Sequence, residues 1–219
     1  MHASADGVVV VIHDETLERT TDGTGLVRAL PLAALQRLDA GHRFRAPDGS
    51  YPFRDRGIRI PTLAELLEAV PDVPLNIEIK QQTPSIEAAV LATLDRFDAR
   101  ARTLLAAEEA EIMVRIRTAA PDMVTSFSAH EVAEFVRRVG GGDFAGYRSP
   151  GIALQVPPAF QDISIITATS VAAAHDLGLE VHAWTINEPD EIEALLALGV
   201  DGIMTDVPGV AARILRKGR

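Results

Sequence analysis

The sequence predicts an α/β fold built on parallel strands, and two observations support this class. Short apolar runs rich in β-branched residues alternate along the chain with longer segments of helical periodicity. The short runs are almost continuously apolar, which is typical of strands covered on both faces. Strands that alternate with helices at this spacing pair in parallel through right-handed crossovers. A βα barrel and an open doubly wound sheet both fit this pattern.

The expected strands are short. One covers residues 8–12 and follows the turn dipeptide Asp6-Gly7, and a second covers 75–79, with the sequence LNIEI. The remaining expected strands, in chain order, are 104–107, 123–127, 152–156, 164–167, 180–186 and 202–205.

The expected helices have recognisable beginnings. Thr62 is followed three residues later by Glu65, and Ser128 by Glu131, so both pairs form capping-box sequences that open helices toward residues 70 and 138. Glycine at 178 and at 199 is placed to end the last two helices of the prediction. The other expected helices are 84–98, 108–119, 170–177 and 188–198.

Residues 15–60 interrupt this alternation. The segment is too long for a βα loop and contains TTDGTG and several Pro, Gly and Arg residues. We expect it to form a small excursion over one end of the sheet. The sequence has no repeat and no obvious interdomain linker, so we predict one domain, 1–219, with an insertion at about 15–60.

Composition limits the possible functions. The 219 residues include 31 Asp and Glu against 21 Lys and Arg, for a formal charge of −10, and no cysteine. Without cysteine the chain has no disulfide, thiolate metal site or Cys nucleophile. The acidic balance argues against sequence-independent nucleic-acid binding and is compatible with capture of a divalent cation. No apolar run approaches the length of a membrane span.

In both parallel architectures, chemistry occurs at the carboxyl ends of the strands. Glu78 and Lys80 lie at the end of the 75–79 strand, and the strand period of two places them on one face with Asn76. Two ionisable side chains in a covered strand are costly unless they are paired or bind something. They are therefore either an internal ion pair or a cation-binding carboxylate beside an anchor for an anionic substrate.

The other candidates have structural alternatives. His13, beside Asp14 at a strand end, is either a surface or capping residue or a general acid/base. Trp184, the single tryptophan, either packs in the core or forms an apolar pocket wall. Asn187 fits equally well as a helix N-cap, and Asp206 as a turn residue. We expect structural roles for the remaining histidines, which are His2, His42, His130, His175 and His182.

Five motifs, in order, resemble the glycerophosphodiester phosphodiesterase family. They are VVVIHDETLERTTDGTG (9–25), IPTLAELLEAV (60–70), LNIEIK (75–80), VHAWTIN (181–187) and GVDGIMTDVP (199–208). The resemblance extends from Asp6 nearly to the C-terminus and is poor between about 100 and 151.

This resemblance implies a TIM-type (β/α)₈ barrel in which 15–60 is the family's insertion. The implied reaction is metal-dependent hydrolysis of a glycerophosphodiester to glycerol 3-phosphate and an alcohol, with Ca²⁺ or Mg²⁺ as cofactor. By motif position, His13 corresponds to a catalytic histidine and Glu78 to a metal ligand. Lys80 corresponds to a phosphate-contacting cation, and Trp184 to part of the substrate pocket.

The family normally has a His-Arg-Gly strand end and a Glu-x-Asp strand before the position of Met1. We therefore expect the barrel to be N-terminally incomplete and this chain to have little or no activity as written. A (β/α)₈ enzyme usually takes about 250 residues, which agrees with a missing segment. The alternatives are a non-catalytic paralogue that binds glycerophosphodiesters or anions, and a fragment that another chain completes. The lack of cysteine and of a leader sequence suggests the cytoplasm.

Overall fold

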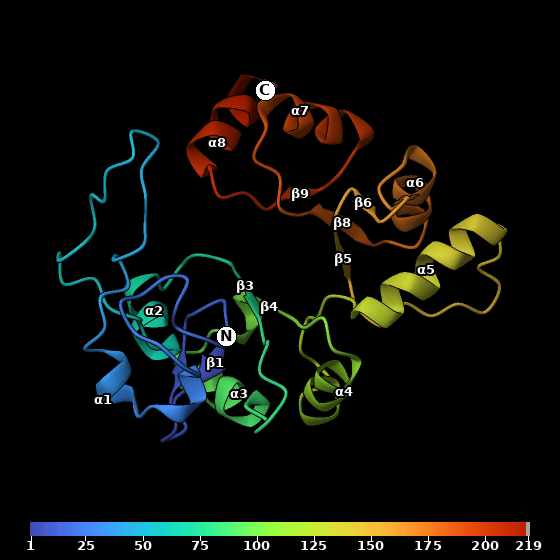
Figure 1. The fold of residues 1–219 in the computed structure, drawn as a ribbon. Coiled ribbons are helices and arrows are strands. Elements are labelled where there is room, and N and C mark those ends of the chain that lie inside the picture. Colours follow the sequence, from blue (N-terminus) through green and yellow to red (C-terminus); the bar gives the residue numbers. More distant parts are fainter. Residues whose placement is uncertain (218–219) are drawn as a thin grey trace. The chain divides into compact units, whose positions relative to one another are not determined.

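The computed structural model describes residues 1–217 and confirms the α/β class. The chain divides into two compact units, Met1–Met123 and Val124–Arg219. Each unit contains parallel strands with helices in the connections between them (Figure 1). The prediction of a single domain with one insertion stays a prediction.

Unit 1 combines short strands with helices around a large apolar core. Three of its helices lie within expected segments, although their ends differ by a few residues, and the short helices at 27–29, 32–35 and 100–102 were not expected. Its elements are β1 (His2–Ala3), β2 (Val9–Val10), η1 (Val27–Ala29), α1 (Leu32–Leu35), α2 (Leu63–Ala69), β3 (Leu75–Glu78), α3 (Glu87–Arg96), η2 (Arg100–Arg102), β4 (Thr103–Ala106) and α4 (Ala110–Ala119).

The first expected strand is shorter than predicted, and its strand partner is antiparallel. Only Val9–Val10 of residues 8–12 forms a strand, and β2 pairs with β1 in an antiparallel hairpin. The turn between them is closed by hydrogen bonds between Ser4 and Val8. Gly7 has a φ of 82°, a conformation that favours glycine. The turn dipeptide was therefore located correctly, but it reverses the chain between two short paired strands.

Strands β3 and β4 form the parallel pair that the sequence predicts. Leu75 is opposite Thr103, and the register continues to Glu78 opposite Ala106. Ile77 and Ile79 are buried in the core of the unit, whereas Glu78 is only partly buried. The strand alternation thus places the apolar side chains and the charged side chains on opposite faces.

The 15–60 segment forms a small substructure with a core of its own. Leu17, Val27, Leu35 and Ile60 pack in it together with Val10 of β2. Helix α2 begins immediately afterwards, where Thr62 and Glu65 make the predicted capping box. The segment therefore packs around apolar side chains of its own, and its expected place as an excursion over one end of the sheet stays a prediction.

Unit 2 contains a three-stranded parallel sheet in the order β5-β8-β9. Ser128 caps α5 as predicted, and Gly199, with a φ of 93°, ends α7. Its elements are α5 (Ala129–Gly141), β5 (Ala153–Val156), β6 (Ala159–Phe160), β7 (Ile163–Ser164), α6 (Ala168–Asp176), β8 (Glu180–Ala183), α7 (Pro189–Leu198), β9 (Gly202–Ile203) and α8 (Pro208–Lys217).

Two strand predictions in unit 2 are wrong in detail. Residues 123–127 contribute only an isolated parallel bridge between Ser126 and Ala153. In place of a strand at 164–167, β7 pairs antiparallel with β6, and Thr167 caps α6. Its hydroxyl accepts a hydrogen bond from the Ser170 backbone, so this residue starts a helix and does not continue a strand. Helix α8 was not among the expected elements.

The sheets found within residues 1–217 do not close into a barrel. Parallel βα units occur both in βα barrels and in open doubly wound sheets, so these units do not distinguish between the two architectures. In that part of the chain, no helix combines the length and apolar character needed to cross a membrane.

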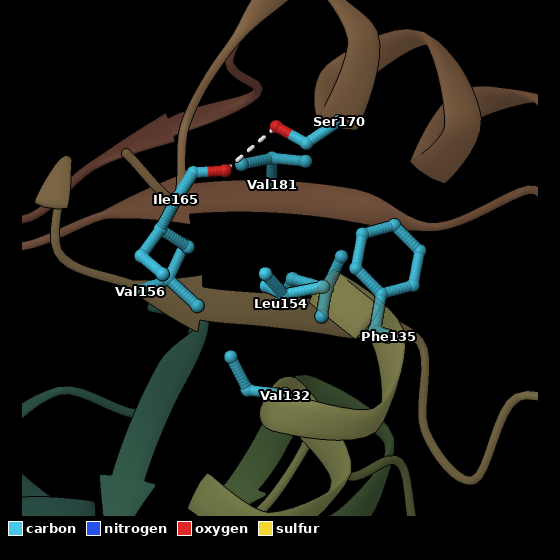
Figure 2. Close-up of a pocket in the computed structure, with 8 residues that line it drawn as sticks. Val132, Phe135, Leu154, Val156, Ile165, Ser170 and Val181 are labelled. Carbon is cyan, nitrogen blue, oxygen red and sulfur yellow. Dashed lines mark hydrogen bonds between the residues drawn. The ribbon is translucent and has the colours of Figure 1, made fainter. Parts of the chain in front are cut away.

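An apolar gap in unit 2 belongs to the core and has no room for a ligand. Figure 2 shows side chains of α5, β5 and β8 around it, with the Ser170 hydroxyl bonded to the Ile165 carbonyl oxygen. Its volume is about 10 Å³, which is at most the space of one water molecule. The polar side chains at the strand ends are therefore the candidates for a functional site.

Candidate active site

Glu78 and Lys80 form an ion pair at the carboxyl end of β3. The Lys80 Nζ lies 2.9 Å from Glu78 Oε1 and 2.8 Å from Oε2, so it contacts both carboxylate oxygens. The Glu78 side chain is 37% exposed and the Lys80 side chain 25% exposed, so solvent reaches the pair. The ion pair, one of the two alternatives for these residues, is therefore present. Because the Lys80 ammonium is partly exposed, it can also bind an external anion.

Strand β2 ends at Val10, so the expectation that His13 lies at a strand end is wrong; backbone contacts of the first two residues nevertheless connect the segment of His13 to this pair. The backbone N–H of Lys80 donates to the carbonyl oxygen of Met1 at 3.2 Å. The Nε2 of the buried His2 donates to the carbonyl oxygen of His13 at 3.1 Å. The structure thus brings the backbone of His13 and the Glu78–Lys80 pair to neighbouring positions within unit 1.

The His13 side chain is 68% exposed and is oriented by Asp14. Its Nδ1 lies 2.7 Å from Asp14 Oδ1. The guanidinium of Arg19 donates to the same carboxylate, and this hydrogen bond is the main reason that the pKa of Asp14 lies well below its usual range. An ionised Asp14 accepts a hydrogen bond, so in the neutral imidazole the proton is on Nδ1 and Nε2 can accept another. This arrangement suits general acid/base chemistry.

A polar hollow of about 280 Å³ lies beside Lys80. Its lining includes two cationic and two acidic side chains, and its volume is just below the range typical of small-molecule sites. The side chains of His13 and Glu78 are not part of its lining. Its lining residues are His2, Glu15, Arg28, Lys80, Gln81, Gln82, Thr83 and Glu109.

Several of these lining residues were missed by the sequence analysis. Gln81 is buried, accepts a hydrogen bond from the Ala3 N–H at 3.0 Å and donates to the Pro84 carbonyl oxygen at 2.9 Å. It follows Lys80 directly, and Glu15 follows the His13-Asp14 pair directly. The signal in the sequence that could have found them is their position within three residues of the ends of the expected strands, 8–12 and 75–79.

The residues present do not fit a divalent-metal site. In residues 1–217, no group of three or more His, Cys, Asp or Glu side chains is arranged to hold an ion. Both oxygens of Glu78 are already in contact with Lys80. A calcium ion takes six to eight oxygen ligands, and Mg²⁺ needs near-octahedral coordination. Glu78 therefore supplies one carboxylate where a metal would need several donors.

Trp184 lies in unit 2, immediately after β8. Its side chain is 42% exposed, so the alternative that it packs in the core is wrong. Its backbone N–H donates to the carbonyl oxygen of Val156 at 3.1 Å, which extends the pairing of β8 with β5. The exposed indole is available as an apolar surface at the carboxyl end of this sheet.

Asn187 connects the segments that follow β8 and β9. Its Oδ1 accepts hydrogen bonds from Thr205 Oγ1 at 3.0 Å and from the Asp206 N–H at 2.9 Å. Its Nδ2 donates to Asp206 Oδ2 at 3.1 Å. Glu188, not Asn187, is the N-cap of α7. The alternative of a capping asparagine is therefore wrong, although the residue has a structural role.

Two other histidines have contacts of the structural kind that we expected. His175 Nε2 lies 3.0 Å from Asp201 Oδ2, and that carboxylate also accepts from the Val181 N–H. His182 lies between Gln155 on the neighbouring strand and Glu180 on its own strand. These contacts tie helix to sheet and strand to strand within unit 2.

A family model named the glycerophosphoryl diester phosphodiesterase family matches residues 1–210. The chain belongs to this family. Its members are phosphodiesterases and generally depend on a divalent metal. The family match agrees with the motif order and includes all of the candidate residues.

Individual members of the phosphodiesterase family cover most of the chain. "Probable glycerophosphodiester phosphodiesterase 2" of Mycobacterium tuberculosis is 32% identical over 94% of this chain and 74% of its own length. A glycerophosphodiester phosphodiesterase of Caldanaerobacter subterraneus is 28% identical over 97% of this chain and 82% of its own.

A solved phosphodiesterase of Oleispira antarctica is similar in structure. It is 25% identical, with a TM-score of 0.76, and the match covers 98% of this chain and 82% of that one. That structure is a complex with the product sn-glycerol-3-phosphate.

Proposed function

We propose that this protein binds a glycerophosphodiester and hydrolyses it to glycerol 3-phosphate and an alcohol. The observation that supports this most directly is the Lys80 ammonium at the end of β3, held by Glu78 and lining a polar hollow. Family membership supplies the substrate class. The glycerol 3-phosphate complex of the Oleispira relative supports a phosphate monoester as the product.

We assign the chemistry to three residues of unit 1. Lys80 binds a non-bridging phosphate oxygen and offsets the charge that develops there. Glu78 holds the ammonium in place by contact with both carboxylate oxygens. His13 Nε2 removes a proton from the attacking water molecule as its oxygen forms the new P–O bond. The P–O bond to the leaving alcohol breaks, and that alkoxide takes up a proton from solvent water.

Two predictions remain outside this scheme. Trp184 as part of the substrate pocket stays a prediction; its indole is exposed at the carboxyl end of β8. Glu78 as a ligand of Ca²⁺ or Mg²⁺ stays a prediction, because it would need further carboxylates and would have to leave Lys80. We assign no step to a metal.

The Lys80 role is tested by replacing it with methionine. Binding of glycerol 3-phosphate, measured by calorimetry, should weaken about tenfold or more, because a hydrogen bond to a charged group typically contributes about 1.5–3 kcal/mol. Lys80→Arg keeps the charge and should retain part of the affinity. The matched control is Arg37→Met, an exposed cation of the same unit outside the hollow. Equal affinities for wild type and Lys80→Met would contradict the role.

The His13 role predicts a different kind of loss. His13→Ala should lower kcat for release of glycerol 3-phosphate from glycerophosphocholine by about 10²–10⁴-fold, as expected for loss of a general acid/base. Affinity for glycerol 3-phosphate should stay unchanged, because the imidazole does not line the hollow. Assays in Ca²⁺, in Mg²⁺ and with a chelator would show whether turnover requires a metal. Unchanged kcat would remove His13 from the scheme.

The second candidate is a non-catalytic protein that binds an anion. It is favoured because Glu78 alone does not supply the donors that a divalent metal needs. Glu78 is a single carboxylate engaged by a lysine, in a family that generally uses a divalent metal. This candidate predicts Lys80-dependent binding of glycerol 3-phosphate without turnover in any metal. That a further segment belongs before Met1, or that another chain completes the fold, stays a prediction.

A further inference from the structure

Residues 41–59 form an exposed loop that the proposed function does not use. The loop contains no helix or strand and extends from the part of unit 1 that holds α1 and α2 (Figure 1). Phe44 is 53% exposed, and Tyr51, Phe53 and Ile58 are 40–42% exposed. Large apolar side chains at this exposure are costly in water, and four of them lie within fifteen residues of one another. We call residues 41–59 the arginine–aromatic loop.

The charge of this loop is opposite to that of the chain. Five of the 21 basic residues and two of the 31 acidic residues lie within it, for a local formal charge of +3 in a chain of −10. All five cations are arginines. The loop therefore combines apolar and cationic side chains in one short segment.

Internal contacts join the two limbs of the loop while its aromatic rings remain exposed. The rings of Phe44 and Phe53 meet edge to face, with centroids 4.8 Å apart. The Arg54 guanidinium lies 3.9 Å from the centroid of the Tyr51 ring, and its Nε donates to the His42 carbonyl oxygen. Gly41 approaches the other limb so closely that a Cβ there would lie 2.4 Å from the Phe53 carbonyl oxygen.

The arginines of the loop differ in whether they pair with an acidic side chain. Arg59 pairs with Glu65 at 2.8 Å. Within residues 1–217, neither Arg45 nor Arg56 has a carboxylate at salt-bridge distance, and both are exposed. Their guanidinium groups can therefore bind an external anion without breaking an internal ion pair.

We propose that the arginine–aromatic loop binds the surface of an anionic phospholipid bilayer. Phe44, Phe53 and Ile58 enter the boundary between headgroups and acyl chains, where apolar groups leave water. Arg45 and Arg56 bind lipid phosphates by charge-assisted hydrogen bonds. Duplex nucleic acid offers phosphates too, but it offers no apolar layer for these side chains.

Vesicle flotation with the full chain tests the proposal independently of any catalytic activity. The protein should float with phosphatidylcholine vesicles that contain one third phosphatidylglycerol. Binding should be much weaker to vesicles of phosphatidylcholine alone, and it should decline as salt is raised, because screening weakens attraction to the anionic surface.

Two variants separate the electrostatic and apolar contributions. Arg45→Gln with Arg56→Gln should reduce vesicle partitioning by about fivefold for each arginine. Phe44→Ser with Phe53→Ser should reduce it by about tenfold for each ring that no longer enters the bilayer. The matched controls are Phe160→Ser, whose side chain is 62% exposed outside the loop, and Arg37→Gln with Arg148→Gln. The controls should float as the wild type does.

Three results would overturn the proposal. One is a wild-type protein that does not float with the anionic vesicles or floats equally well with neutral ones. The second is loop variants that retain wild-type partitioning while thermal melting shows that they are folded. The third is retention of duplex DNA on filters without flotation, which would make the loop a polyanion site.

Discussion

At the scale of single residues, His2 is a buried histidine of unit 1. Burial lowers the pKa of His2 below its ordinary value near 6.5. The neutral ring donates from Nε2 to the His13 carbonyl oxygen at 3.1 Å. Protonation of this ring in the folded protein would therefore place a charge in a desolvated position next to the candidate site.

The shifted pKa predicts a pH-dependent loss of stability. Because the unfolded chain takes up the proton first, the free energy of unfolding should be highest above about pH 6.5. It should fall as the pH drops from there through the lowered pKa of the folded state. His2→Gln can keep a donor to the His13 carbonyl oxygen but cannot titrate, so its urea midpoint should decline less over pH 7.5 to 5. Parallel pH profiles for the two proteins would contradict the assignment.

The placement of Lys80 could be predicted from the sequence, whereas the exposure of Trp184 could not. The strand period placed Glu78 and Lys80 on one face, and the structure confirms that placement. Exposure of Trp184 depended on how β8 ends, and that could not be inferred from one aromatic residue in an apolar run. Neighbouring side chains decide between core and surface, and these neighbours come from distant parts of the chain.

At the scale of elements, helix beginnings were the most predictable features. Thr62 Oγ1 accepts from the Glu65 N–H at 3.1 Å, and Glu65 Oε2 accepts from the Thr62 N–H at 2.8 Å. The Ser128–Glu131 box has the same reciprocal form. Such caps involve residues three positions apart, so the chain segment contains the information that locates them.

Contacts between elements were not predictable in the same way. The nearly buried Glu87 of α3 accepts from Arg115 of α4, with Nε and Nη2 at 2.9 and 2.8 Å from one carboxylate oxygen. The two residues are 28 positions apart, and neither belongs to a motif. This ion pair joins consecutive helices of unit 1.

Loss of Arg115 should destabilise unit 1 strongly. Arg115→Met leaves the Glu87 carboxylate buried without its partner, and breaking a buried pair in this way typically costs about 3–5 kcal/mol. Arg115 is 36% exposed, so we expect the lower end, about 3 kcal/mol, in the free energy of unfolding measured with urea. The double variant Arg115→Met with Glu87→Gln removes the stranded charge and should recover part of that loss. Equal stabilities of the single and double variants would contradict a charge effect.

At the scale of the whole molecule, the chain consists of two units with parallel βα structure and belongs to a phosphodiesterase family. The α/β class followed from alternation along the sequence, and the family followed from five motifs in order. The sheets do not close into a barrel within residues 1–217, so the TIM-type architecture stays an implication of the family. The acidic net charge gave no indication that cations and aromatic rings gather in residues 41–59.

By itself the sequence determined the class of fold, the helix caps, the face of β3 that presents Glu78 and Lys80, and the phosphodiesterase family. All of these depend on spacings of a few residues or on contiguous motifs. Only the tertiary structure decided that β1 and β2 pair antiparallel, that Glu78 is engaged by Lys80, and that Gln81 and Glu15 share a hollow with Lys80. These depend on which segments meet in space, which is decided by the packing of the whole unit.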